Sequence, residues 1–105
     1  MLTSEGKGRA DGNHTRPTWT ALSGKADGEI CGIAAMSHPS NFRSPQPVRI
    51  HPKLAYFCFA PMVLGDFKLE PEKPYVSRFR FVAFDGPANP DQLEMIWRHF
   101  TKEQQ

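Results

Sequence analysis

The feature that most constrains the fold is the stretch 30–51, in which an apolar run leads directly into a stiff polar loop. Residues 30–36 have the length and composition of a buried β-strand. The loop that follows contains Pro39, Pro45 and Pro47, which prevent it from continuing as a sheet or a helix. A stiff loop that leaves a buried strand often holds polar groups in fixed positions. This loop carries five such groups, namely His38, Asn41, Arg43, Arg49 and His51.

The rest of the chain favours an antiparallel β architecture. Five segments have strand patterns, namely residues 18–23, 30–36, 54–60, 67–69 and 75–84. Asp27-Gly28 supplies the turn of a hairpin between the first two segments. The nearly continuous apolar composition of residues 54–60 predicts a strand that is covered on both faces. Ten prolines and eight glycines imply many turns, which also favours β-structure over a helical bundle.

The longest predicted strand, residues 75–84, has two different faces. Alternation places five side chains on a predicted core face, namely Tyr75, Ser77, Phe79, Phe81 and Ala83. The opposite face contains Arg78 and Arg80, and we expect these arginines to face solvent or a polar cleft.

A C-terminal amphipathic helix is predicted after this strand. Asn89 is a suitable N-cap, and Pro90 suits the first helical position. An apolar stripe follows at helical spacing, formed by Leu93, Ile96, Trp97 and Phe100. Residues 101–105 are expected to be a frayed polar end. The sequence thus predicts one all-β domain at residues 18–105, a sandwich or jelly-roll-like fold with one C-terminal helix, preceded by a mobile arm or loop at residues 1–17.

Composition excludes several classes of function and location. A net charge of +2 is too small to indicate nucleic acid as a partner. No apolar run approaches the roughly 20 residues of a membrane helix, and the first residues do not resemble a signal peptide. We therefore expect a soluble chain of undetermined location. Cys31 and Cys58 are interpreted as free thiols, with a disulfide left open if their strands are neighbours.

The polar residues favour ligand binding. Between Glu29 and Asp66 the chain has basic residues and no carboxylate. Such a loop suits an anionic or hydroxyl-rich ligand, because arginine donates paired hydrogen bonds. The expected ligand-binding residues are therefore His38, Asn41, Arg43, Arg49, His51, Arg78 and Arg80. Trp19 and Tyr56 offer aromatic faces for a sugar.

A metal site is the alternative interpretation. The chain has four histidines, His14, His38, His51 and His99. His38 and His51 lie in the polar loop, and with a further ligand they would bind copper, zinc or iron. There is no Gly-x-Ser-x-Gly nucleophile motif. The acidic residues lie mostly in turns and in the predicted helix, which disfavours a paired-carboxylate hydrolase.

Several motifs resemble the C-terminal part of the so-called methane oxygenase PmoA-like proteins. They are Ser4-Glu5-Gly6, Trp19, Leu22-Ser23-Gly24, Gly32-Ile33-Ala34, His38-Pro39-Ser40-Asn41 and Asp85-Gly86. The resemblance implies a β-sandwich protein of unestablished function, of a kind often found in bacteria that degrade polysaccharides. It also implies that this chain corresponds to the last third of a longer protein. The chain departs from that pattern at His51-Pro52-Lys53, where an acidic residue and a glycine are expected, and it lacks the usual acidic residue two positions after Trp19.

These observations predict a carbohydrate-associated binding or accessory domain, with its site in the polar loop at residues 37–51. No cofactor is expected for that function. The alternative is a small copper- or iron-dependent oxidoreductase that acts on polysaccharide through His38 and His51, and a third interpretation is a structural fragment bound to a partner. Because five strands leave sheet edges or apolar faces bare, we also expect a homo-oligomer, namely a two-fold dimer.

Overall fold

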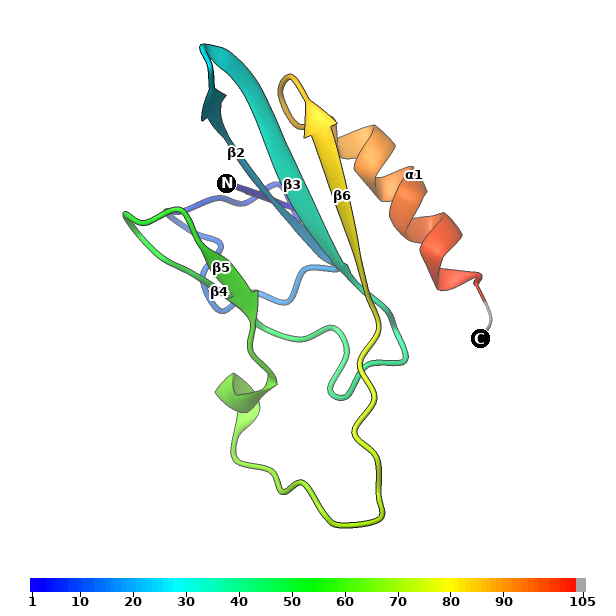
Figure 1. Cartoon of the computed structure of the whole chain (residues 1–105). Helices are drawn as coiled ribbons and strands as arrows, with labels where there is room; N and C mark the ends of the chain where they lie inside the picture. The colour runs from blue at the N-terminus through cyan, green and yellow to red at the C-terminus, as the bar shows by residue number, and fades with distance from the viewer. Residues whose placement is uncertain (104–105) are drawn as a thin grey trace.

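The computed structural model describes residues 1–103 and shows a mostly β chain with one C-terminal helix (Figure 1). The elements in chain order are β1 (Leu2–Thr3), β2 (Trp19–Ala26), β3 (Glu29–Ser37), β4 (Val48–Ile50), β5 (Phe57–Phe59), the 3-10 helix η1 (Pro61–Leu64), β6 (Phe79–Asp85) and α1 (Pro90–Thr101). The predicted fold class is confirmed. The last two residues of the predicted polar end, Gln104 and Gln105, lie outside the described residues.

The main sheet has four antiparallel strands in the order β1-β2-β3-β6. Its centre is the predicted hairpin, in which β2 and β3 pair from Trp19↔Met36 to Ala26↔Glu29. Asp27 and Gly28 form the turn with φ values of 52° and 80°. This left-handed conformation is the one that an Asp-Gly turn supplies at low cost, so the local sequence dictates the hairpin.

Helix α1 packs on one face of the main sheet and forms the core with it (Figure 1). Asn89 caps the helix, because its side chain accepts a hydrogen bond from the backbone N–H of Gln92 at 3.1 Å. Leu93 and Phe100 are buried, and Ile96 and Trp97 pack beside them. The sheet contributes Trp19, Ala21, Ala34 and Met36 to the same core. The predicted helix, its start and its apolar stripe are confirmed.

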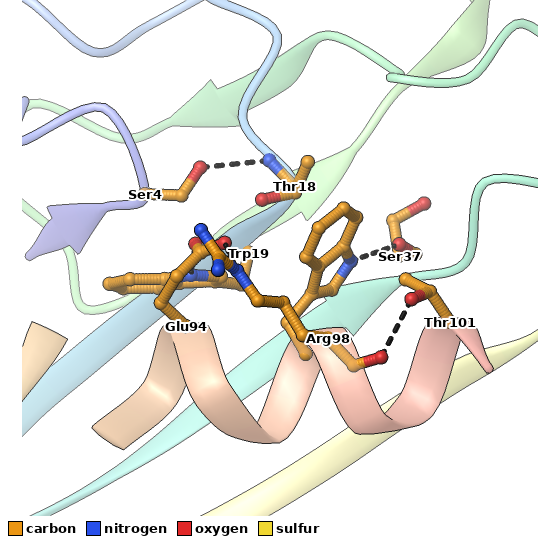
Figure 2. A network of polar contacts seen from close by, with 8 residues as sticks. Ser4, Thr18, Trp19, Ser37, Glu94, Arg98 and Thr101 are labelled. Carbon is orange, nitrogen blue, oxygen red and sulfur yellow. Dashed lines mark hydrogen bonds and ion pairs between the residues drawn. The ribbon is translucent and has the colours of Figure 1, made fainter. Parts of the chain in front are cut away.

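Two indole N–H groups connect the helix to the sheet. Trp19 donates to Oε1 of Glu94 on α1 at 3.1 Å, and Figure 2 shows Glu94 and Arg98 against this indole. Trp97 donates in the opposite direction, to the backbone carbonyl of Ser37 at 2.9 Å. A buried indole N–H needs a partner, so these bonds fix how the helix lies on β2 and β3.

The second sheet pairs β5 with β4, a strand in the segment that was predicted as loop. Only Phe57–Phe59 of the apolar run at residues 54–60 forms a strand, because its partner β4 has just three residues. The prediction that this run is covered on both faces is wrong, since Leu54 and Tyr56 are exposed. Residues 67–69 form no strand. Cys58 in β5 is an exposed free thiol, and Cys31 in β3 is also free.

The predicted core face of β6 is also wrong. Val82 and Phe84 pack against the core, whereas Phe81 is 67% exposed. The alternation predicted two distinct faces, but α1 covers the one that contains the arginines. The strand begins at Phe79 and not at residue 75, so the preceding residues are an extended connection.

The N-terminal segment, expected as a mobile arm or loop, begins with β1 and then forms a long loop. β1 pairs with β2, and Thr3 is buried. Further along, the loop bonds to β4: His14 donates its backbone N–H to the carbonyl of Val48 at 2.6 Å, and Val48 donates to that of Thr15 at 2.9 Å. This segment thereby connects the two sheets. No helix within residues 1–103 has the length and apolar character needed to span a bilayer.

Candidate functional site

The residues predicted to bind a ligand fall into separate places. His38, Asn41, Arg78 and Arg80 gather where β3 ends and β6 begins, beside the C-terminal end of α1. Arg43 contacts the loop around η1 instead. Arg49 and His51 belong to the β4–β5 hairpin, which lies on the other side of the main sheet from that end of α1 (Figure 1). The polar loop therefore does not form a single pocket mouth.

Asn41 organises the first group. Its side chain is only 4% exposed. The amide nitrogen donates to the hydroxyl of Ser37 at 3.0 Å and to the carbonyl of Arg78 at 2.9 Å. Its amide oxygen accepts the backbone N–H of Arg78 at 2.7 Å. The side chain of Asn41 therefore bonds to the backbone of Arg78 as a neighbouring strand would. It fixes the position of the chain just before β6.

His38 is buried against the same chain segment and is 7% exposed. Its Nε2 lies 3.1 Å from Nη1 of Arg78, and its Nδ1 lies 2.7 Å from the hydroxyl of Ser40. Nδ1 also accepts the backbone N–H of Ser40 at 3.0 Å, so both ring nitrogens face N–H donors, which disfavours the protonated imidazolium. Burial, together with the nearby charge of Arg78, lowers the pKa of His38. The geometry and the pKa direction both describe a neutral imidazole.

Arg78 and Arg80 lie over the ring of Phe100, the last buried residue of α1. Their guanidinium carbons are 5.8 Å and 4.9 Å from the ring centroid. Arg80 is paired with Glu103, and its hydrogen bond lowers the pKa of that carboxyl group. Among the described residues, no carboxylate forms an ion pair with Arg78. Arg80 therefore forms the ion pair with the Glu103 carboxylate, and Arg78 acts on the same group only at longer range.

Arg43 has a structural position. Its guanidinium group donates to three backbone carbonyls, those of Pro61 at 3.0 Å, Gly65 at 2.6 Å and Asp66 at 3.1 Å. It also lies 4.8 Å from the ring centroid of Phe42. These contacts join the polar loop to the loop that follows η1. They use the guanidinium N–H donors of Arg43, which were expected to bind a ligand.

Three aromatic rings gather beside Arg43, and we call the hollow that they line the aromatic cleft. The ring of Phe42 is 4.9 Å from that of Phe67 and 5.9 Å from that of Tyr75. Phe67 and Tyr75 are stacked at 6.1 Å. The cleft has a volume of about 340 Å³. Its remaining lining comes from Lys68, Leu69, Glu70, Lys73 and Pro74.

Sequence analysis missed the aromatic cleft. Phe42 directly follows Asn41 in the polar loop, so an aromatic residue amid polar ones was the available signal. Phe67 was assigned to a short strand and Tyr75 to a core face, yet Phe42 and Tyr75 are both exposed. Phe42 comes from the polar loop, and Phe67 and Tyr75 come from the long connection before β6, so only the course of these two loops brings the three rings together.

His51 is used within its own turn. Its Nδ1 accepts the backbone N–H groups of Lys53 at 3.0 Å and Leu54 at 2.8 Å, and its ring lies 5.1 Å from that of Tyr56. His38 and His51 share no contact partner. Throughout residues 1–103, no three histidine, cysteine, aspartate or glutamate side chains are grouped as metal ligands would be.

A second hollow lies between the two sheets and is almost wholly apolar. It has a volume of about 300 Å³. Its lining consists of Ile33, Ala35, Phe57, Cys58, Phe59, Phe79 and Phe81. These residues occupy the face of the main sheet that α1 leaves uncovered, together with the inner side of β5. The hollow is therefore an open part of the space between the two sheets.

Comparison with known proteins identifies a family but no activity. No curated protein matches the chain, and no solved structure matches it. One family model matches residues 1–98, that of a family described as "Family of unknown function (DUF6807)". Because this match covers nearly all of the chain, the protein belongs to this family of unknown function.

Proposed function

We propose that this chain is a carbohydrate-binding domain and that the aromatic cleft is its site. The observation that carries the proposal is the grouping of Phe42, Phe67 and Tyr75 around one hollow at the surface. A sugar ring has an apolar face of C–H groups, which packs on an aromatic ring. Binding sites typically combine such apolar walls with a few polar groups that fix the orientation of the ligand.

The polar groups at the cleft suit hydroxyl ligands. Lys68, Glu70 and Lys73 line it beside the rings, and Glu70 and Lys73 form an ion pair of 2.9 Å. Such exposed pairs are weak, so they rearrange at little cost when hydroxyl groups arrive. By contrast, the hollow between the sheets has no charged residue in its lining. The aromatic cleft is therefore the better of the two for a sugar.

Arg43 holds together the loops that form the aromatic cleft. It anchors both loops that supply the rings through the carbonyls of Pro61, Gly65 and Asp66. A site whose supporting residues are fixed loses less conformational freedom when its ligand binds. In this proposal, the role of Arg43 is thus to position Phe42 and Phe67, and contact with the sugar falls to the rings.

The resemblance to PmoA-like proteins, which often come from polysaccharide-degrading bacteria, agrees with this proposal. The oxidoreductase alternative has less support, because it requires His38 and His51 to act together. The protein itself engages both nitrogens of His38, and His51 belongs to a different part of the fold. A binding domain requires no such convergence.

The proposal predicts that Tyr75→Ala weakens carbohydrate binding about two- to tenfold. An aromatic contact contributes about 0.5–1.5 kcal/mol, and 1.4 kcal/mol corresponds to a factor of ten. Calorimetric titration with neutral hexasaccharides of glucose, xylose and mannose measures the affinity. Tyr56→Ala is the matched control, because Tyr56 is also an exposed tyrosine and lies on the β4–β5 hairpin. Absence of binding to all three sugars, or equal affinities of the two variants, would contradict the proposal.

A further inference from the structure

We propose that Arg78 and Arg80 form a second binding site, which takes a carboxylate, and that Glu103 occupies part of this site when no ligand is bound. The site is independent of the aromatic cleft, because the two share no residue. Its ligand class is a small molecule with one carboxylate, such as a sugar acid. The support comes from the placement of the two arginines, their charge balance and the carboxylate that the chain itself provides.

The arginines are held in place before any ligand arrives. Arg80 lies in β6 and Arg78 directly precedes that strand, and both lie on the side of the sheet that α1 covers. Asn41 holds the backbone of Arg78, and Nε2 of His38 lies 3.1 Å from Nη1 of its guanidinium group. Phe100 lies under both guanidinium groups. Flexible arginine side chains lose conformational entropy when they bind, and these contacts reduce that loss in advance.

The net charge at this site favours the binding of one negative group. Two guanidinium groups supply two positive charges, Glu103 supplies one negative charge, and His38 is neutral. Within residues 1–103 this site therefore carries one more positive than negative charge, and Arg78 is the arginine without an ion pair of its own. Because a guanidinium group presents several N–H donors in a planar fork, its free donors match the two oxygens of a carboxylate.

The carboxylate that the chain itself places at this site indicates the anion that we expect the site to take. Glu103, just beyond α1, places its carboxylate on Arg80. The carboxylate side chain is 46% exposed, so it is open to displacement by solvent or by a ligand. An incoming carboxylate would use the free donors of Arg78 and compete with Glu103 for those of Arg80. Phosphate and sulfate differ in charge or shape from the Glu103 carboxylate that contacts Arg80, so we name a carboxylate as the ligand.

The test is an NMR titration of the full chain with D-glucuronate, with neutral D-glucose as the matched ligand. We expect glucuronate to shift the arginine side-chain signals at millimolar concentration and glucose to leave them unchanged. Arg78→Lys keeps the charge but removes the fork, and it should weaken glucuronate binding about tenfold or more. Arg98→Lys is the control, because Arg98 is an exposed arginine that pairs with Glu94 elsewhere on α1. It should stay within about twofold of wild type.

Glu103→Gln gives an independent readout. Removing the competing carboxylate should tighten glucuronate binding about two- to fivefold, the range expected for an exposed ion pair. Unchanged or weaker binding in this variant would overturn the role of Glu103. An equal response to glucose, or equal affinities of the Arg78→Lys and Arg98→Lys variants, would overturn the site. The indole signals of Trp19 and Trp97 report whether each variant keeps its fold, since both indoles bond across the core.

Discussion

At the scale of single residues, the polar loop mostly binds to its own protein. Asn41, His38 and Arg43 were expected to bind a ligand from their chemistry alone. In the structure, Asn41 pairs with the backbone of Arg78, and Arg43 donates to three carbonyls across the neighbouring loop. A proline-rich loop forms few backbone pairs, so side chains must satisfy its polar groups. This need explains why amides and guanidinium groups are concentrated there.

Asn41 should therefore matter for stability. Asn41→Ala leaves the backbone N–H of Arg78 without its partner and removes three hydrogen bonds from a buried site. An unsatisfied buried group costs about 1–3 kcal/mol, so we expect a loss of about that size in the free energy of unfolding. Urea unfolding measures this loss. Asn89→Ala, which removes an exposed helix cap, is the comparison and should cost about 1 kcal/mol. A smaller loss in Asn41→Ala than in Asn89→Ala would contradict this structural role.

At the scale of elements, α1 packs across neighbouring strands of the main sheet. Its buried side packs on β2 and β3, and the Trp19 and Trp97 indoles bond across this contact in opposite directions. The helix also lies beside Arg78 and Arg80 through Phe100. Both the core and the proposed carboxylate site thus depend on its docking.

Trp97→Ala tests that docking. The change removes a large half-buried side chain and the hydrogen bond to Ser37, and it should lower the free energy of unfolding by about 3–5 kcal/mol. Thermal or urea unfolding gives the difference. Met95→Ala, on the exposed side of the same helix, should stay within about 0.5 kcal/mol of wild type. If the two variants are equally stable, α1 is not docked through Trp97.

The elements also show which features the sequence could predict. The hairpin and the helix follow from local signals, namely the Asp27-Gly28 turn and the Asn89 cap with its apolar stripe. The covered face of β6 depends instead on where α1 packs, and alternation within one strand cannot supply that information. The aromatic cleft was missed for the same reason, because Phe42, Phe67 and Tyr75 meet only through the paths of two long loops. Local features were predictable, and features made by distant segments were not.

At the scale of the whole molecule, one face of the main sheet is incompletely covered. The β4–β5 sheet lies over part of it and leaves the apolar hollow open. Phe81 is 67% exposed and Ile33 is 43% exposed on this face. β6 is also an edge strand, and within residues 1–103 no other strand pairs with its outer side. An open edge beside an exposed apolar face is a surface that associates with another chain.

A second copy of the chain suits this surface, so the dimer expected from the sequence remains our prediction. Antiparallel pairing of β6 with β6 of the partner would continue both main sheets and satisfy the open edge on each copy. The same two-fold axis would bring the Phe81 side chains of the two copies together. Phe81 and Ile33 are exposed apolar residues on this face, and such residues suit contact with an identical face.

Sedimentation equilibrium at micromolar concentration tests the dimer, and Phe81→Glu should shift the population to single chains. Burying one phenylalanine contributes about 1.5–3 kcal/mol, so its loss from each copy should weaken association by more than about tenfold. The variant should still fold, because Phe81 is mostly exposed in the single chain. Leu54→Glu places the same charge on an exposed leucine of the β4–β5 hairpin and should leave the dimer intact. If the wild type sediments with the mass of one chain, the dimer prediction is wrong. The open face of the main sheet then does not bind a second copy, and β6 does not pair with β6 of another chain.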